Sequence, residues 1–445
     1  MEHIAIIGNG VAGATAARHI RKQSDVKISL ISSEHDYFFS RTALMYVYMG
    51  HMRFKDMEPY EPWFWEKNRI DLVCDHVTHI DFEKKRLHFA NRTESMPYTK
   101  LLLATGSKPN KFGWPGQDLD GVQGLYSKQD LEMLERNTPG TTAAIIVGGG
   151  LIGIELAEML ASRNIEVHLL VRENGFWNNV LPRQESQLIG RHIKEHHIAL
   201  HCETNLKEIL PDQNGRVRAV TTDQGEEIPC QIVGLTPGVH PNIEFLKETP
   251  LETNKGILVN RYLETNIPDV YAMGDCVEHR ERIGNRPPIE AVWYTGRLMG
   301  ETVAQTICGK RTPYSPGNWF NSAKFLDIEY QTYGWVFPKL KEEQTDFYWE
   351  HQDGKKCMHF VYEAEGRTFV GVNTFGIRLR HEVIDRFLTQ NATIEEVLSQ
   401  LKNALFDPEF FHSHEKSIIE KFNEENHTQI KLKKKNWKFI LNTVK

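Results

Sequence analysis

The stretch HIAIIGNGVAGATAARHI, residues 3–20, is the one around which the rest of the chain is organised. His3–Ile7 is short, mostly apolar and β-branched, which predicts a buried parallel strand. Glycines 8, 10 and 13 follow directly, and Ala14–Ile20 predicts the start of a helix. A strand, a G-x-G-x-x-G loop and a helix, in this order, form the arrangement that binds dinucleotides.

Each glycine of this loop has a physical task. Gly8 makes the tight turn, Gly10 lets the backbone approach a pyrophosphate, and Gly13 lets the helix pack closely on the strand. Ala12 lies in the same loop and is counted with the cofactor-binding residues. The free N–H groups and the dipole at the helix N-terminus favour the negative charge of a pyrophosphate.

The second strand is predicted at Val26–Ile31, and the first acidic residue after it is Glu34. We expect Glu34 to bind a ribose hydroxyl, as an acidic residue near this position does in such units. Arg41 is a candidate for reaching the cofactor phosphates, although a surface arginine is the plainer interpretation. The aromatic and Met-rich stretch Met45–Trp65 predicts packing and a pocket wall.

The same unit occurs a second time. Ala143–Val147 predicts a buried strand, and the loop Gly148–Gly153, a helix and the strand Glu166–Val171 follow it. Two such units imply two nucleotide-type ligands. The candidate ligand-binding positions of the second loop are Gly148, Gly150, Leu151, Ile152 and Gly153.

The residues after the second unit bear on the choice of nicotinamide cofactor. Arg172 favours NADPH, because an arginine can bind a 2′-phosphate, whereas Glu173 keeps NADH open. The strand at Ile232–Leu235 closes this part of the chain and leads to Gly238.

Three further segments are candidate site elements. Leu101–Leu103 predicts a strand that ends in the turn Ala104-Thr105-Gly106. Pro268–Asp275 predicts a strand that ends in Gly274-Asp275, where the carboxylate can bind a polyol hydroxyl or, alternatively, cap the next segment. Pro287–Glu290 introduces a helix from about Ala291 to Ile307, whose N-terminus can stabilise a negatively charged reduced cofactor.

Antiparallel structure is predicted in two places. Val77–Asp81 and Arg86–Phe89 alternate as in a small hairpin layer. Beyond Pro316 the pattern indicates a separate α+β domain. Its predicted strands are Phe325–Tyr330, Phe347–Glu350, Met358–Tyr362 and Thr368–Val372, and its predicted helices are Arg380–Gln390 and Thr393–Asn403.

Composition excludes several classes of protein. The chain of 445 residues is 40% hydrophobic and 25% charged, with a net charge of -6, which argues against nucleic acid as the main partner. No apolar run reaches the ~18 residues of a membrane span, and we expect no signal peptide because the N-terminus leads into a core strand. The six scattered cysteines include no C-x-x-C pair, which fits a reducing cytoplasm.

No metal site is predicted. His196-His197 and His412-Ser413-His414 lack the companions that such a site needs, and we interpret them as surface or loop histidines. The Lys-rich segment from Lys431 to Lys445 is interpreted as a solvated tail or a packed terminal element, with a membrane-surface segment as the alternative.

The motifs together resemble, in order, those of FAD-dependent pyridine nucleotide-disulfide oxidoreductases. The resemblance covers about residues 1–320 and implies an α/β fold with two Rossmann-like three-layer dinucleotide-binding domains, as in glutathione reductase, plus a C-terminal α+β interface domain. The implied segments are an FAD domain at 1–112 and 245–318, an NAD(P) domain at 113–244 and the interface domain at 319–445. A homodimer through the C-terminal domain is also a family expectation.

The resemblance also implies roles for individual residues. Gly8, Gly10 and Gly13 would hold the FAD pyrophosphate, the backbone of Val77 would meet the adenine, and Asp275 would bind the ribityl chain. The segment Glu290–Trp293, which includes Val292, resembles the one beside the flavin ring. Glu155 matches the glutamate near flavin N5 and the nicotinamide amide, and it is the one candidate catalytic residue.

The chain departs from the family at two positions. Thr42 stands where some relatives carry a redox cysteine, and Tyr46 stands where ferredoxin-reductase-like members have a lysine that pairs with the glutamate. The disulfide-reducing cysteine pair is also missing. The resemblance therefore implies a member in which the flavin alone transfers electrons.

The expected activity is hydride transfer from NAD(P)H to FAD, with electrons passed on to a small redox protein such as ferredoxin or rubredoxin. Three alternatives stay open: an NADH oxidase or quinone reductase, a flavin-binding redox sensor similar to apoptosis-inducing factor, and the reductase component of a nitrite-reductase-like system.

Overall fold

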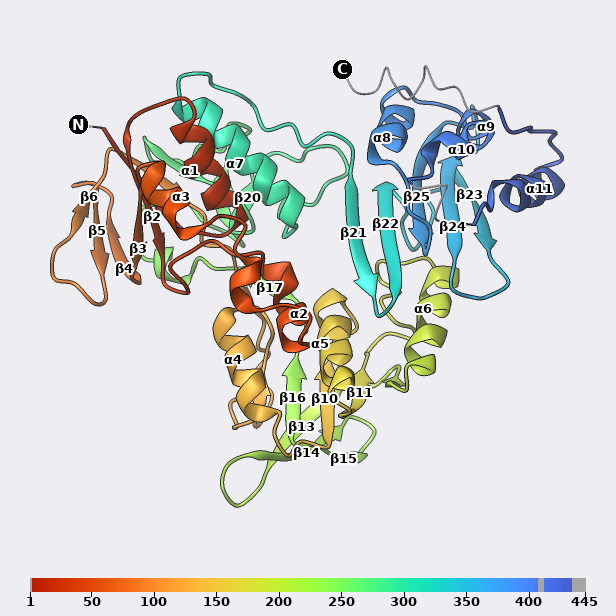
Figure 1. The fold of residues 1–445 in the computed structure, drawn as a ribbon, viewed down its shortest axis with the longest axis horizontal. Helices are drawn as coiled ribbons and strands as arrows, with labels where there is room; N and C mark the ends of the chain where they lie inside the picture. The colour runs from red at the N-terminus through yellow and green to blue at the C-terminus, as the bar shows by residue number, and fades with distance from the viewer. Residues whose placement is uncertain (1, 407–411, 434–445) are drawn as a thin grey trace.

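The computed structural model describes residues 2–406 and 412–433, and two parallel five-stranded sheets carry its two glycine loops (Figure 1). The first sheet has the strand order β19-β7-β1-β2-β3. Its strands are His3–Ile7 (β1), Lys27–Ser32 (β2), Ile70–Cys74 (β3), Lys100–Leu103 (β7) and Val270–Ala272 (β19). The pairing of β1 with its two neighbours has no register shift, and Ile4 lies opposite both Ile28 and Lys100. Strand β19 joins this sheet from far along the chain, because the second sheet lies between β7 and β19 in sequence.

The second sheet has the strand order β12-β11-β10-β16-β9 and is parallel throughout. Its strands are Val122–Gln123 (β9), Ala143–Val147 (β10), Glu166–Leu170 (β11), Ala199–His201 (β12) and Ile232–Leu235 (β16). Its helices are Lys128–Asn137 (α4), Leu151–Ser162 (α5) and Arg183–Glu195 (α6). A small antiparallel sheet is appended to it, with strands Leu206–Pro211 (β13), Val217–Thr222 (β14) and Glu227–Pro229 (β15).

The chain crosses between the two parallel sheets twice, and the crossings are hydrogen-bonded to each other. Ser107–Pro109 (β8) leaves the first sheet, Val239–Pro241 (β17) returns to it, and the two pair antiparallel. The remaining short strands are Val77–Asp81 (β4), Arg86–Phe89 (β5), Met96–Pro97 (β6), Ile257–Val259 (β18) and Val277–His279 (β20). The predicted hairpin layer is therefore confirmed as part of the antiparallel sheet β4-β5-β6.

Two glycines of the first loop have the packing roles that their positions predict. Gly8 has φ +110°, and a Cβ there would lie 2.0 Å from the carbonyl oxygen of Ala104. A Cβ on Gly13 would lie 1.9 Å from the carbonyl oxygen of Gly8. Only glycine permits these approaches of the loop to β7 and of the helix Val11–Arg21 (α1) to the loop.

The C-terminal part is a five-stranded antiparallel sheet in the order β21-β22-β25-β24-β23. Its strands are Phe320–Phe325 (β21), Ile328–Gly334 (β22), Gln344–Glu350 (β23), Cys357–Glu363 (β24) and Phe369–Phe375 (β25). The helices are Trp293–Ile307 (α7), which precedes the sheet and lies beside α1, then His381–Thr389 (α8), Ile394–Ser399 (α9), Leu401–Ala404 (α10) and Glu415–Asn426 (α11). Helices Leu44–Tyr48 (α2) and Pro62–Lys67 (α3) complete the set of α-helices in the described residues.

Two local predictions are wrong. The single strand expected at Phe325–Tyr330 is broken by a tight turn at Leu326 and Asp327, between the end of β21 and the start of β22, with Phe325 opposite Ile328 and Leu326 at φ 58°. The alternation of apolar and polar residues in this segment is typical of a strand. Leu also rarely adopts positive φ, so nothing in the sequence indicated a turn at Leu326. The helix expected over Thr393–Asn403 is interrupted at Gln400, which separates α9 from α10.

The fold class predicted from the sequence is confirmed, and the domain boundaries at 112, 244 and 318 stay predictions. Among the described residues, no helix is both long and apolar enough to cross a lipid bilayer. Of the Lys-rich segment, residues 434–445 lie outside the described residues.

A buried charge network joins the second parallel sheet's region to the C-terminal sheet. The ring of His359 on β24 hydrogen-bonds to Glu185 Oε1 on α6 at 2.8 Å and to Asp346 Oδ2 on β23 at 2.7 Å. Asn373 Nδ2 donates to the other oxygen of Glu185 at 2.8 Å. Glu185 is fully buried. Burial alone would lower the pKa of His359, but its bonds to Asp346 and Glu185 outweigh burial and raise this pKa to about 9.

We expect this network to make stability depend on pH. Because the pKa of His359 is higher in the folded state than its ordinary 6.5, its contribution is complete below about pH 6.5 and disappears as the pH rises through about 9. Glu185→Gln should lower the free energy of unfolding by about 3 kcal/mol at pH 7, because it removes the fully buried one of the two anions that flank the His359 imidazolium and leaves only Asp346. Denaturant unfolding from pH 6 to 10 measures both effects, with Glu424→Gln on α11 as control. A wild-type unfolding free energy that is constant from pH 6.5 to 9 would contradict the assignment.

Candidate functional site

A cavity of about 1380 Å³ lies at the carboxyl ends of the strands of the first sheet, where ligands bind in open α/β sheets. Its lining comes from the first glycine loop, the segments after β2 and β7, the first turn of α5, the segment Met273–Asp275 and the β21–β22 hairpin. One continuous space therefore touches both glycine-loop units and the C-terminal sheet.

The first glycine loop presents open backbone to this cavity. Gly10 has φ −66°, and no atom of the described part of the chain lies within 4 Å of where its Cβ would be. The residue caps the N-terminus of α1, and the first turn of α1 contains no acidic side chain. These features suit an anionic group that approaches the exposed N–H groups of the helix.

Glu34 and Arg41 lie together on the cavity wall. Arg41 Nη1 donates to Glu34 Oε1 at 2.9 Å, and the same oxygen accepts from the backbone N–H of Lys128 at 2.8 Å. Arg41 also donates to the carbonyl of Tyr126. The carboxylate of Glu34 is thus held in position, while contact of Arg41 with a phosphate stays a prediction.

Asp275 lines the cavity at the end of β19, as the sequence predicts. Its Oδ2 accepts a hydrogen bond from Ser107 Oγ at 3.1 Å. Burial raises the pKa of this carboxyl, which Ser107 and Arg41 partly oppose. The other predicted residues that line the same cavity are Gly8, Ala12, Val77, Ala104, Thr105, Gly106, Gly274 and Val292.

Glu155 enters the cavity from α5 together with Leu151 and Ile152. Burial, and secondarily the charge of Glu158, raises the pKa of Glu155 to about 7. Thr42 and Tyr46, the two positions where the family resemblance implies a departure, also line this space.

All six cysteines of the chain are free, and none of them lines the cavity.

A lysine of the C-terminal sheet, which the sequence did not point to, lies at the cavity beside α5. Lys324 Nζ of β21 lies 3.3 Å from Glu158 Oε1, one helical turn beyond Glu155. The C-terminal sheet thus supplies a positive charge to the cavity wall, whereas Tyr46 supplies none.

Several predicted residues lie outside the cavity lining, namely Gly13, Gly148, Gly150, Gly153, Arg172, Gly238 and Glu290. Glu290 departs most from expectation, because it is buried and accepts a hydrogen bond from Arg286 Nη1 at 2.7 Å. Its neighbours Ala291 and Val292 line the cavity instead. Arg172 is exposed, and its Nε donates to Glu173 Oε1 at 2.8 Å.

The C-terminal part contributes cavity residues that the sequence motifs do not predict. Asn321–Lys324, Glu329–Gln331 and Arg378 line the cavity. No local motif marks these residues, and their place follows from the packing of the β21–β22 hairpin against α5.

The prediction that His196 lacks companions is also wrong. His192, His196 and Asp327 bring three ligand atoms within 4.8 Å of one another. His197 is exposed, as predicted.

The comparisons with known proteins agree with this geometry. The nitrite reductase [NAD(P)H] of Bacillus subtilis is 27% identical over 385 residues, 85% of this chain and 46% of that protein. A ferredoxin–NAD(P)(+) reductase of Sphingomonas sp is 29% identical over 74% of this chain and 80% of its own length. The chain therefore spans about half the length of the first of these relatives and most of the second.

Among solved structures, a NAD-dependent persulfide reductase from A. fulgidus shares the fold, with a TM-score of 0.81 at 20% identity over 96% of this chain and 84% of that one. Residues 2–299, more than half of the chain, match the family model described as pyridine nucleotide-disulphide oxidoreductase. The family's cofactors are FAD and NAD(P)H, and this chain belongs to the pyridine nucleotide-disulphide oxidoreductase family.

Proposed function

We propose that this chain is an NAD(P)H-dependent FAD oxidoreductase that passes electrons on to a small redox protein such as ferredoxin or rubredoxin. One observation carries the proposal: a single cavity is lined both by the first glycine loop and by the start of α5, directly after the second glycine loop. Two nucleotides held by these loops would meet in that space.

The residues fit FAD along the first sheet. Gly8, Gly10 and Ala12 would receive the pyrophosphate, and Gly13 keeps α1 close enough for its N–H groups to take part. The remaining assignments are Glu34 for a ribose hydroxyl, Arg41 for a phosphate, the backbone of Val77 for the adenine, and Asp275 for the ribityl chain. Ala104, Thr105, Gly106, Gly274 and Val292 would form the wall beside them, and Glu290, which Arg286 holds in place, adjoins that wall through its neighbours Ala291 and Val292.

The second unit fits NAD(P)H. Gly148, Gly150 and Gly153 would hold its pyrophosphate, with Leu151 and Ile152 beside the nicotinamide and Gly238 at the crossing between the sheets. Arg172 and Glu173 form an ion pair in the structure, so this pair leaves both NADH and NADPH possible.

Bound FAD supplies the chemistry that no side chain here can, namely uptake of a hydride and release of electrons. The chain would contribute position: it would align the two cofactors, exclude water and hold Glu155 beside the nicotinamide. A carboxylate at Glu155 would stabilise the positive charge that grows on the nicotinamide as the hydride leaves.

The acceptor is part of the proposal. The ferredoxin reductase relative, which this chain matches over most of its length, favours a small electron-carrier protein. A second candidate is the reductase component of a nitrite-reductase-like system, favoured because the B. subtilis relative matches 85% of this chain. A homodimer through residues 319–445 and a cytoplasmic location, which the six free cysteines fit, complete the proposal.

Anaerobic titration of the purified protein tests the function. We expect NADH or NADPH to bleach the flavin absorption, and oxidised ferredoxin or rubredoxin to restore it. Fast restoration by oxygen or a quinone alone would support the oxidase or quinone-reductase alternative, and a long-lived charge-transfer band would support the redox sensor. If neither nucleotide bleaches the flavin, the reductase proposal is wrong.

Glu155 predicts a pH dependence of the reduction step. We expect the rate of flavin reduction by NADH to rise as the pH increases through about 7, because Glu155 then loses its proton. Glu155→Gln should remove this rise and lower the rate at pH 8 by about tenfold, which corresponds to about 1.4 kcal/mol. Stopped-flow reduction from pH 5.5 to 9 measures it, with Glu132→Gln on α4 as control. An unchanged pH profile in Glu155→Gln would refute the role of this carboxylate.

The two glycines at positions 10 and 13 should respond differently to substitution. Gly10→Val places its side chain in open cavity space, so we expect an unchanged melting temperature of the apoprotein but FAD affinity lower by at least about tenfold. Gly13→Ala should lower the melting temperature itself, because its Cβ meets the Gly8 carbonyl. Fluorescence titration with FAD and thermal melts of both apoproteins distinguish the two effects. Equal FAD affinity of Gly10→Val and wild type would contradict the assigned pyrophosphate position.

A further inference from the structure

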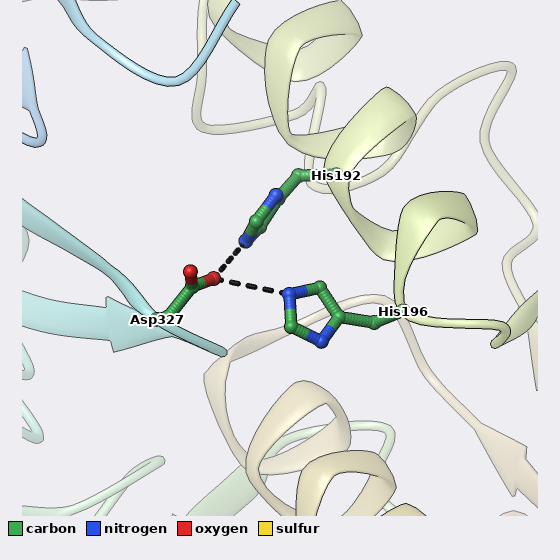
Figure 2. A group of neighbouring side chains, drawn as sticks. All are labelled: His192, His196 and Asp327. Carbon is green, nitrogen blue, oxygen red and sulfur yellow. Dashed lines mark hydrogen bonds and ion pairs between the residues drawn. The ribbon is translucent and has the colours of Figure 1, made fainter.

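Two histidines and an aspartate converge at the border between α6 and the C-terminal sheet (Figure 2). His192 lies in the last turn of α6, and His196 caps its C-terminus. Asp327 lies in the turn between β21 and β22. The spacing of four residues places both histidines on one face of the helix, and both rings point toward Asp327.

The ligand atoms meet at one point. Nε2 of His196 lies 3.0 Å from Asp327 Oδ1, and Nε2 of His192 contacts the same oxygen. All three atoms lie within 4.8 Å of one another. An ion about 2 Å from each of them could be accommodated by a small rotation of Asp327, whose side chain is 60% exposed.

The surroundings of the cluster also suit a cation. His192 is 99% buried, and its other nitrogen, Nδ1, has no hydrogen-bond partner within residues 2–406 and 412–433 but lies 3.5 Å from Glu195 Oε2. A metal-bound histidine commonly directs its second nitrogen at a carboxylate in this way. The C-terminal end of α6, with its partial negative charge, faces the same point. His196 is 39% exposed, so water can complete the coordination.

We propose that His192, His196 and Asp327 form a binding site for a divalent transition metal, with Zn²⁺ the best match to two imidazoles and one carboxylate. Glu195 is a positioning residue that orients His192. The site is distinct from the cofactor cavity, since none of its three residues lines that cavity.

The ion would act as a clamp. It would bind α6 to the tip of the β21–β22 hairpin, while the sides of the same hairpin, including Lys324 and Tyr330, line the cofactor cavity. Anchoring the tip would hold these cavity residues in place. The consequence for the protein is stability of the border between the two parts, and the proposal requires no change in the electron-transfer chemistry.

The test uses the untagged full-length chain with its flavin, after chelator treatment and dialysis. Zn²⁺ alone is titrated by calorimetry, and Co²⁺ is followed by its visible d–d absorption as a difference spectrum against the flavin. We expect one tight Zn²⁺ site per chain, imidazole-type Co²⁺ bands and a higher melting temperature with Zn²⁺. His196→Asn/Asp327→Asn should weaken Zn²⁺ binding by more than about 100-fold, and Glu195→Gln by about tenfold.

His197→Asn is the matched control, because His197 is the exposed neighbour of His196 and has φ 60°, which asparagine tolerates. It should bind Zn²⁺ as the wild type does. Flavin content and far-UV circular dichroism confirm that each variant is folded. The proposal is overturned if wild-type protein shows no saturable Zn²⁺ binding, or if the double variant binds as tightly as the wild type. Neither result bears on hydride transfer, so this site and the proposed function fail separately.

Discussion

The close approach of three backbone segments at the first glycine loop is the constraint on which the rest of the structure depends. A Cβ at Gly8 or Gly13 would lie about 2 Å from a carbonyl oxygen of Ala104 or Gly8. Because glycine has only a hydrogen where other residues have a Cβ, α1 can begin directly at the carboxyl end of β1, beside β7. The helix N-terminus then opens onto the cavity.

The second unit repeats this constraint. A Cβ on Gly148 would lie 2.4 Å from the carbonyl oxygen of Thr236, and one on Gly153 would lie 2.1 Å from that of Gly148. The paired crossings β8 and β17 fix one unit relative to the other. As a result α5 delivers Glu155 into the space that the first unit opens, in surroundings poor enough in water to raise its pKa to about 7.

Charges at the border of the C-terminal sheet connect this sheet to the site. Glu185 on α6 is bonded to His359, and Glu158 on α5 is paired with Lys324. Buried ion pairs add less to stability than their Coulomb energy suggests, but they are costly to break one partner at a time. The buried pair of Glu185 and His359 therefore favours a single arrangement of the C-terminal sheet, the one in which its first hairpin completes the cavity wall.

Local sequence determined those parts of this protein that depend on interactions between residues close together in the chain. Both glycine loops, their strands and helices, and the position of Asp275 could be predicted, because turn geometry and hydrophobic period are set by neighbours in the chain. Glu155 was expected only from the family resemblance. Tertiary structure alone decided that Lys324 reaches the cavity and that His192 and His196 meet Asp327. Each of these depends on segments that are distant in sequence, or on the turn at Leu326, which contains no glycine to mark it. The residue pattern carries no information about such packing.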